Sequence, residues 1–376
     1  MTGFVNAHTH LYSGLVPFGL PSPSPPPATL LDVLRRFWWR VDRALDAPML
    51  RAAARYYVAD ALLHGTDTLV DHHESPCLIE GSLDVLADAC HELGVRAVLC
   101  YGATERNAGR TEAERGLAEC RRFIRENRRP LVRGVVGLHA SFTVSDETIR
   151  EAGEMCRQLD TVLHVHAAED ACDVDDAQSR GYEGVIDRLR SLGALPAGSV
   201  LAHGVHLTRS EVAELDSFGC WLVQNPRSNE QNRVGYPAAL GASLLVALGT
   251  DGFPSEMTAE REAGARLAVA HGEPQSVAAE RLQAGNELVA QWFDHRSSEA
   301  FEVRSPASGV VPTFQTRNAT PDGGLTSHLV DRLVIAGRTV VDGGRLVTGD
   351  WNAIREEAAE QAKRLAERMK AVASSE

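Results

Sequence analysis

The chain has 376 residues, 44% hydrophobic and 24% charged, which is typical of a folded globular protein and excludes a disordered or fibrous one. Acidic residues outnumber basic ones by 51 to 38, for a net charge of −13, which argues against nucleic acid or an anionic membrane as partner. Without a run of eighteen apolar residues, a signal-peptide pattern or a C-x-x-C pair among its seven cysteines, the sequence predicts a cytoplasmic protein with reduced thiols.

Short β-branched runs alternate with amphipathic segments along the first 250 residues. Between the runs, apolar residues recur at three- and four-residue steps, which is typical of helices packed on a sheet. Eight strands with helices between them favour a (β/α)8 TIM-like barrel over a doubly wound open sheet, which normally has fewer strands. The expected strands are Phe4–His10, Asp67–Asp71, Arg96–Tyr101, Val132–His139, Thr161–His166, Ser199–His203, Cys220–Val223 and Leu244–Thr250. The clearest expected helices are Leu30–Ala44, Ser82–Leu93, Ala113–Glu126, Thr148–Leu159 and Arg209–Ser217.

The composition changes after the expected barrel. We predict a hydrolase barrel over residues 1–300 and an accessory region over residues 301–376. This region opens with a stretch rich in Ser, Pro, Thr and Gly up to residue 327, which is typical of a linker. Three short strands joined by Ala-Gly and Gly-Gly turns and one amphipathic helix should follow. They are expected at Arg332–Ile335, Arg338–Val341, Arg345–Val347 and Asn352–Val372.

Histidines and acidic residues gather at the carboxyl ends of four expected strands, where barrel enzymes build their sites. His8 and His10 end the first strand, and alternate residues of a strand share a face, so both can point into the barrel mouth. A lone strand-end histidine is more often a packed residue, but a set at one end of one barrel favours a metal centre. Imidazoles with one carboxylate suit zinc or iron(II). The other members are His166 with Glu169 three residues later, His203, and Asp251 in Gly-Thr-Asp-Gly.

This set of residues resembles the amidohydrolase superfamily, and more closely its aminohydrolase branch of cytosine, guanine and adenosine-nucleoside deaminases and chlorotriazine hydrolases. Five longer strings are similar to the SsnA-type aminohydrolases. The resemblance covers residues 3 to about 260. Relatives carry strands of a small β-sandwich before the barrel, whereas the first strand expected here already belongs to the barrel. We therefore expect a truncated remnant of the sandwich at the C-terminal end. The strings are Val5–Tyr12, Phe37–Asp42, His64–His73, Gly137–Phe142 and Gly249–Gly252.

The resemblance also implies one divalent metal per chain. Binuclear members of the superfamily bridge two ions with a carboxylated lysine inside the barrel, and the only lysines here are Lys363 and Lys370, in the expected terminal helix. Zinc is the favoured ion, with iron(II) and manganese(II) as alternatives, since imidazoles with a carboxylate tolerate each of them. The ligands implied are His8, His10, His166 and Asp251.

The reaction that the resemblance implies is hydrolytic deamination of an aminated heterocycle, such as a purine, a pterin or another cyclic amidine. The metal lowers the pKa of its bound water, and Asp251 and His203 accept the proton of that water and orient it. Glu169 is not a ligand and protonates the ring nitrogen, after which ammonia leaves. Zinc base deaminases of an unrelated fold pair a bound water with a nonligand glutamate in the same way. Whether His203 coordinates the metal or only hydrogen-bonds stays open.

Four further residues are expected to contact the substrate or shape its pocket. His139, at the end of the fourth strand, resembles a substrate-contacting histidine of related deaminases. Asn225 and Ser228 belong to an Asn-Pro-Arg-Ser-Asn run that resembles an element beside the metal. One of the neighbouring His72 and His73 should point inward, and we assign His73 to the substrate.

Two other functions stay open. A hydrolase of another C–N or C–Cl bond, namely a ring-opening amidase, a deiminase or a dechlorinase, would keep the metal and change the leaving group. A degenerate, noncatalytic binding protein is the third hypothesis, although the complete ligand set with Glu169 argues against it. The expected partners are a small-molecule substrate and a second copy of the chain in a homodimer. The aromatic run Phe37–Trp39 is expected in the core or a subunit contact rather than against a ligand.

Overall fold

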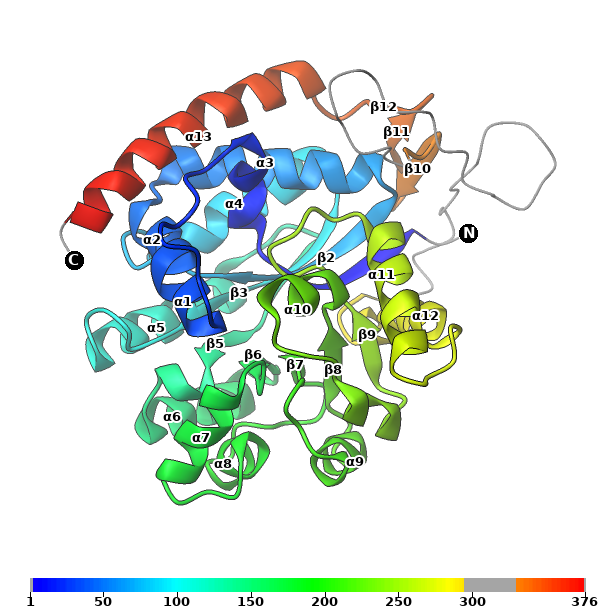
Figure 1. Cartoon of the computed structure of the whole chain (residues 1–376). Coiled ribbons are helices and arrows are strands. Elements are labelled where there is room, and N and C mark those ends of the chain that lie inside the picture. Colours follow the sequence, from blue (N-terminus) through cyan, green and yellow to red (C-terminus); the bar gives the residue numbers. More distant parts are fainter. Residues whose placement is uncertain (1–2, 294–328, 375–376) are drawn as a thin grey trace.

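The computed structural model describes residues 3–293 and 329–374. Its centre is a ring of parallel strands with helices outside it (Figure 1), which confirms the expected (β/α)8 barrel. A short strand, β4 (Val132–Gly134), pairs beside the ring with β3. In ring order the strands are β1 (Phe4–Thr9), β2 (Thr66–His73), β3 (Arg96–Ala103), β5 (Val136–Ala140), β6 (Leu163–Ala167), β7 (Val200–His203), β8 (Trp221–Gln224) and β9 (Val246–Leu248).

The ring closes between β1 and the segment that follows β9. Thr9 and Asp251 form a parallel bridge there, and the backbone N–H groups of Thr250 and Asp251 both donate to the carbonyl of His8, at 2.9 and 3.0 Å. Closure therefore brings the expected histidines of the first strand against the expected aspartate after the last one.

Some of the helices begin at residues whose side chains cap them. Ser145 and Thr208 accept hydrogen bonds from backbone N–H groups of the first turns of their helices, and Glu211 completes a capping box with Thr208. The α-helices are α1 (Leu30–Val33), α2 (Trp39–Ala44), α3 (Ala47–Leu63), α4 (Ser82–Leu93), α5 (Arg110–Glu126), α6 (Asp146–Leu159), α7 (Ala171–Ser179), α8 (Val185–Ser191), α9 (Arg209–Ser217), α10 (Pro226–Asn232), α11 (Met257–Ala270), α12 (Val277–Val289) and α13 (Trp351–Ser374). Short 3-10 turns are η1 (Leu11–Phe18), η3 (Ser141–Thr143) and η4 (Ala238–Ala242), and η2 (Leu34–Trp38) is a π-helical turn.

Two expected elements are subdivided, and several helices were not among the clearest expected ones. The strand expected at 132–139 is two strands, because Val135 between them donates to the carbonyl of Leu99. The helix expected at 30–44 is interrupted by the π-helical turn η2. The longest of the helices not named from the sequence is α3, although Asp46 caps its start and Pro48 occupies its first turn, which are ordinary start signals.

The C-terminal region packs on the barrel rather than apart from it. The strands β10 (Arg332–Ile335), β11 (Arg338–Asp342) and β12 (Arg345–Leu346) form an antiparallel sheet, as expected for the sandwich remnant. Helix α13 runs along α3 (Figure 1), and the ring of Trp351 stacks on that of Tyr56 at 5.4 Å. Buried residues of this sheet and helix share one apolar core with the barrel. The expected linker, and the domain boundary at residue 300, lie outside the described residues.

In the described ranges, none of the helices has both the length and the apolar character that crossing a lipid bilayer requires.

Candidate metal centre and substrate pocket

Five of the expected residues converge at the carboxyl end of the barrel. Nε2 of His10 lies 2.9 Å from Oδ1 of Asp251, and Nε2 of His8 lies 3.5 Å from the same oxygen. Nε2 of His166 is 3.3 Å from Nε2 of His10. Ligand atoms of His8, His166, His203 and Asp251 all lie within 4.8 Å of one another. The four strands that carry these side chains thus bring them to a single point.

The four imidazoles share one orientation, with Nδ1 held from behind and Nε2 turned toward the centre. Such anchoring fixes the tautomer of a histidine and orients it for a metal. The anchors are the carbonyl of His72 for His10 (2.5 Å), the carbonyl of His139 for His166 (2.7 Å), Oδ1 of Asn229 for His203 (2.9 Å) and Nε2 of His164 for His8 (2.9 Å).

The donor set fits a divalent cation. Nε2 of His8 and Nε2 of His203 are buried without a hydrogen bond, which is costly unless another group occupies the point they face. Burial lowers the pKa of His8 to about 3, so this ring is neutral. Burial raises the pKa of Asp251, but hydrogen bonds with His10 and His8 hold it well below the usual range. Neutral imidazoles beside an ionised carboxylate are ligands that zinc, iron(II) and manganese(II) accept.

A proton and a metal ion would compete for the ring of His10. Burial lowers the pKa of His10, yet the hydrogen bond and charge of Asp251 raise it to about 10. A histidine must lose that proton to act as a ligand, so metal binding at His10 would release it.

The backbone is strained where it presents these groups. Six of the described non-glycine residues have positive φ values, and three of them, Ala168, His203 and Asp251, with φ of 49°, 77° and 53°, lie at this site. Such conformations cost about 1–3 kcal/mol each and collect at functional sites. The turn at Ala168 brings Glu169 over the centre.

Glu169 stands beside the centre as a nonligand acid. Its Oε2 lies 3.6 Å from Nε2 of His203, and Nδ2 of Asn232 donates to its Oε1 at 3.4 Å. Burial is the main cause that raises the pKa of Glu169, and the negative charge of Asp251 raises it further. The resulting pKa is about 7. Near neutral pH this carboxyl can therefore both hold and release a proton.

The Asn-Pro-Arg-Ser-Asn run lies behind the centre rather than on the pocket wall. Oγ of Ser228 donates to Oδ2 of Asp251 at 2.5 Å, and Nδ2 of Asn225 lies 3.4 Å from Nδ1 of His203. Neither residue lines the pocket, so both support the metal-site residues where the sequence suggested substrate contact. The ion pair between Arg227 and the buried Glu260 holds the run against α11.

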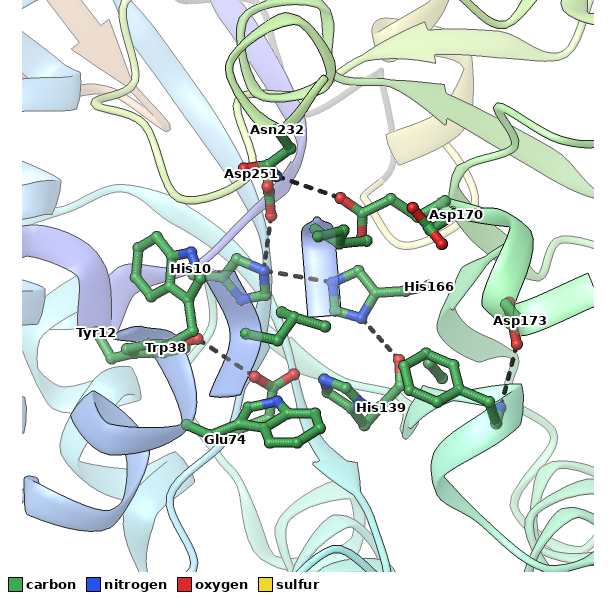
Figure 2. A pocket seen from close by; sticks show the side chains of 16 residues that line it. His10, Tyr12, Trp38, Glu74, His139, His166, Asp170, Asp173, Asn232 and Asp251 are labelled. Carbon is green, nitrogen blue, oxygen red and sulfur yellow. Dashed lines mark hydrogen bonds and ion pairs between the residues drawn. The ribbon is translucent and has the colours of Figure 1, made fainter. Parts of the chain in front are cut away.

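The pocket beside the centre has an aromatic wall (Figure 2). Trp38 and Trp39 both line this wall, and Trp38 also packs against the apolar core, as the sequence predicted. His139, expected to contact the substrate, does line the pocket, with Nδ1 2.9 Å from Oγ1 of Thr143. The full lining is His10, Tyr12, Leu30, Leu34, Trp38, Trp39, Glu74, His139, Ala140, Phe142, His166, Glu169, Asp170, Asp173, Asn232 and Asp251.

The end of β2 turns the other histidine inward. The ring of His73 packs between Tyr12 and Tyr101, at centroid distances of 5.8 and 5.7 Å, and does not line the pocket. His72 instead lies 4.5 Å from the ring of His166. Glu74 reaches the pocket and was not predicted from the sequence. It lies two residues after His72, and residues two apart on a strand share a face, so an inward His72 would have indicated an inward Glu74.

Comparison with known proteins agrees with this geometry. Residues 1–288 match the Amidohydrolase family. The chain belongs to that family. This amidohydrolase is 27% identical over 388 residues to 5′-deoxyadenosine deaminase of Methanopyrus kandleri, covering 97% of the chain and 86% of the relative. It is 31% identical over 272 residues to 8-oxoguanine deaminase of Pseudomonas aeruginosa, covering 68% of the chain and 60% of the relative.

A solved structure shares the fold. The adenosine deaminase of Xanthomonas campestris with bound zinc aligns with a TM-score of 0.73 and 22% identity, over 97% of this chain and 85% of that one. The expected family, its deaminase branch and the barrel fold are thus confirmed, and this amidohydrolase is a metal-dependent hydrolase of C–N bonds.

Proposed function

We propose that this amidohydrolase releases ammonia from an aminated heterocycle at a mononuclear centre. The observation that carries the proposal is the position of Glu169, a partly buried acid with a pKa of about 7 in the same pocket as the converging histidines and Asp251. An acid held there can protonate a ring nitrogen, and that proton transfer distinguishes deamination from simple metal binding.

One ion per chain, preferably zinc, is proposed because the residue that bridges two ions in binuclear relatives is missing from the barrel sequence. His8, His10, His166 and Asp251 would hold it through the inward Nε2 atoms and a carboxylate oxygen. When bound, a divalent ion lowers the pKa of a coordinated water toward neutrality. The zinc in a structural relative supports this choice of ion.

The residues of the chain divide the proton transfers between them. Asp251 and His203 accept the proton of the attacking water, and Ser228 orients Asp251 through its 2.5 Å hydrogen bond. Glu169 gives its proton to the ring nitrogen next to the attacked carbon, and Asn232 holds the carboxyl in place. Asp251 or His203 then passes the proton taken from water to the amino group, which leaves as ammonia. Asp251, His203 and Glu169 thus handle all the proton transfers between them.

The side chains of the aromatic pocket wall indicate the substrate class. Trp38, Trp39 and Phe142 offer flat apolar surfaces that suit an aromatic ring, and His139 adds one polar contact. The relatives named for deamination of 5′-deoxyadenosine and of 8-oxoguanine support a purine-like ring. The homodimer and the cytoplasmic location stay predictions.

Ammonia release from a panel of purines, pterins and pyrimidines tests the proposal. Glu169→Gln should reduce turnover by at least about 1,000-fold while metal content stays at about one ion per chain. Asp251→Asn should lose most of the metal, and Glu114→Gln on the outer face of α5 is the control. Activity of the Glu169→Gln protein equal to the parent would refute the role of this acid. Lack of ammonia from every ring by the metal-loaded parent would refute deamination.

A further inference from the structure

A second acidic group faces the pocket, and the proposed reaction leaves it without a role. Glu74 is 3% exposed and lines the pocket. One of its carboxylate oxygens lies within 4.8 Å of one ring nitrogen each of His10, His72 and His166. Figure 2 shows Glu74 and Asp251 on opposite sides of His10 and His166. The pocket therefore has a carboxyl group at each side of the point where a ring would react.

The contacts of Glu74 leave acceptor capacity on the carboxylate. Its Oε1 lies 2.8 Å from Nδ1 of His72, whose Nε2 faces the carbonyl of Leu138 at 3.0 Å. Its Oε2 accepts a hydrogen bond from the hydroxyl of Tyr12 at 3.3 Å. A carboxylate oxygen has two acceptor positions, so each oxygen can accept one more N–H.

Arg106 lies at this end of the pocket and pairs with an acid other than Glu74. Arg106 pairs with the buried Asp42 at 3.1 Å and lies over the ring of Trp39, 4.8 Å from its centroid. These contacts hold the indole of Trp39 in the wall next to Glu74. A ligand that enters the pocket thus meets an aromatic face with an acceptor at its edge.

We propose that Glu74 selects a cyclic guanidine, a ring in which the amino-bearing carbon lies between an acceptor nitrogen and an N–H. This inference rests on the proposed deamination and names its substrate class. The acceptor nitrogen would face the protonated Glu169, and the ring N–H would donate to Glu74. The closeness of Glu74 to His10 and His166 requires a donor on the reacting ring itself, not on a remote substituent such as a sugar.

The class excludes simple amidines. In adenine and cytosine the reacting carbon has a ring nitrogen on one side and a carbon on the other, which would leave the remaining acceptor positions of the buried Glu74 unfilled and cost affinity. Guanine, pterin and isocytosine carry the required N–H. In the reaction, the oxygen of water bonds to the ring carbon, the bond from that carbon to the amino nitrogen breaks, and ammonia leaves with its two amino hydrogens and one proton of water. The other proton of water restores the one that Glu169 gave to the ring nitrogen. Glu74 keeps its hydrogen bond throughout and donates no atoms.

Matched ligands test the proposal on the unaltered, metal-loaded protein. Values of kcat/KM for ammonia release are compared for guanine, isocytosine and pterin against adenine, cytosine and 5′-deoxyadenosine, and for guanine against 1-methylguanine, which lacks the N–H. The guanidines should be favoured, and 1-methylguanine should be at least about 100-fold worse than guanine. Preference for the amidines, or equal use of 1-methylguanine, would overturn the role of Glu74 while ammonia release still supports deamination.

Variants separate hydrogen bonding from steric effects. Glu74→Gln should lower kcat/KM for guanine by about 10- to 100-fold with the metal retained, and Glu74→Ala should remove most of the discrimination against 1-methylguanine. Isocytosine binding to Glu169→Gln protein, with and without Glu74→Gln, is measured by calorimetry as a readout that needs no turnover. If no compound of the panel releases ammonia, the proposed deamination is wrong, and the binding measurement alone tests Glu74. Equal isocytosine affinity with and without Glu74→Gln would then overturn the inference.

Discussion

Nδ1 of His8 lies 2.9 Å from Nε2 of His164, so a second imidazole anchors this proposed ligand. Nδ1 of His164 in turn faces the sulfur of Cys100 at 3.7 Å. His164 accepts at Nε2 when its proton is on Nδ1, and His8 then donates from Nδ1 and keeps Nε2 free for a cation. The other three inward histidines are held by oxygen atoms, so this pair is the one anchor that a change of ring protonation would break.

Replacing His164 should therefore weaken metal binding. His164→Phe keeps a ring of similar shape but removes the acceptor for His8, and loss of such an anchor typically costs 10- to 100-fold in metal affinity. Competition against a chromogenic zinc chelator measures this change. His206→Gln, at an exposed position, is the control and should bind zinc as the parent does. Equal affinity of the His164→Phe protein would mean that His8 needs no anchor.

The sequence anticipated the barrel because each strand is a short β-branched run between helices whose apolar spacing is clear. The cluster of candidate ligands was equally visible, since strand ends collect on one face of any such barrel. Because side chains alternate along β2, one of His72 and His73 must point inward. Which of the two does so depends on the register of β2 against its neighbouring strands. The sequence assignment of His73 rather than His72 shows that limit, and Glu74 went unnoticed with it.

Apolar spacing also cannot distinguish a core face from a pocket wall. Trp38 has the pattern of a buried helix residue and does pack against the core, yet it also lines the pocket together with Trp39. Asn225 and Ser228 contact His203 and Asp251 from behind, and their contact with the substrate stays a prediction.

Activity should fall as the pH rises through about 7. Glu169 must be protonated to act as the acid, and its raised pKa of about 7 means that it loses this proton above neutrality. The hydrogen bond from Asn232 stabilises the ionised form and so lowers this pKa. Asn232→Ala should therefore move the alkaline limb of the kcat/KM profile to higher pH. If the alkaline limb stays in place or moves to lower pH, then a group other than Glu169 causes it.

The turn that carries Phe142 should depend on a buried arginine. Arg188 on α8 is fully buried and donates to the carbonyl of Ser141 at 2.7 Å and to the carboxylate of Asp146 at 2.9 Å. Arg188→Met should lower the free energy of unfolding by about 3 kcal/mol, because it leaves buried acceptors unpaired. Arg190→Met on the same helix removes an exposed ion pair and should cost less than about 1 kcal/mol. Urea denaturation of the metal-loaded proteins compares them, and equal losses would contradict the assignment.

The aromatic wall should be sensitive to the glycine that follows Asp251. A Cβ on Gly252 would stand 2.7 Å from Cζ2 and Cη2 of Trp38, so alanine there must displace the indole. Overpacking of this kind costs about 1–3 kcal/mol, and Gly252→Ala should raise KM by about 10-fold with a smaller change in kcat. In a Trp38→Ala background the same substitution should have almost no effect, because the clashing ring is gone. Gly241→Ala, whose nearest contact is 3.5 Å away, is the control. Additive effects of the two substitutions on KM would show that Gly252 acts on the centre directly and not through the wall.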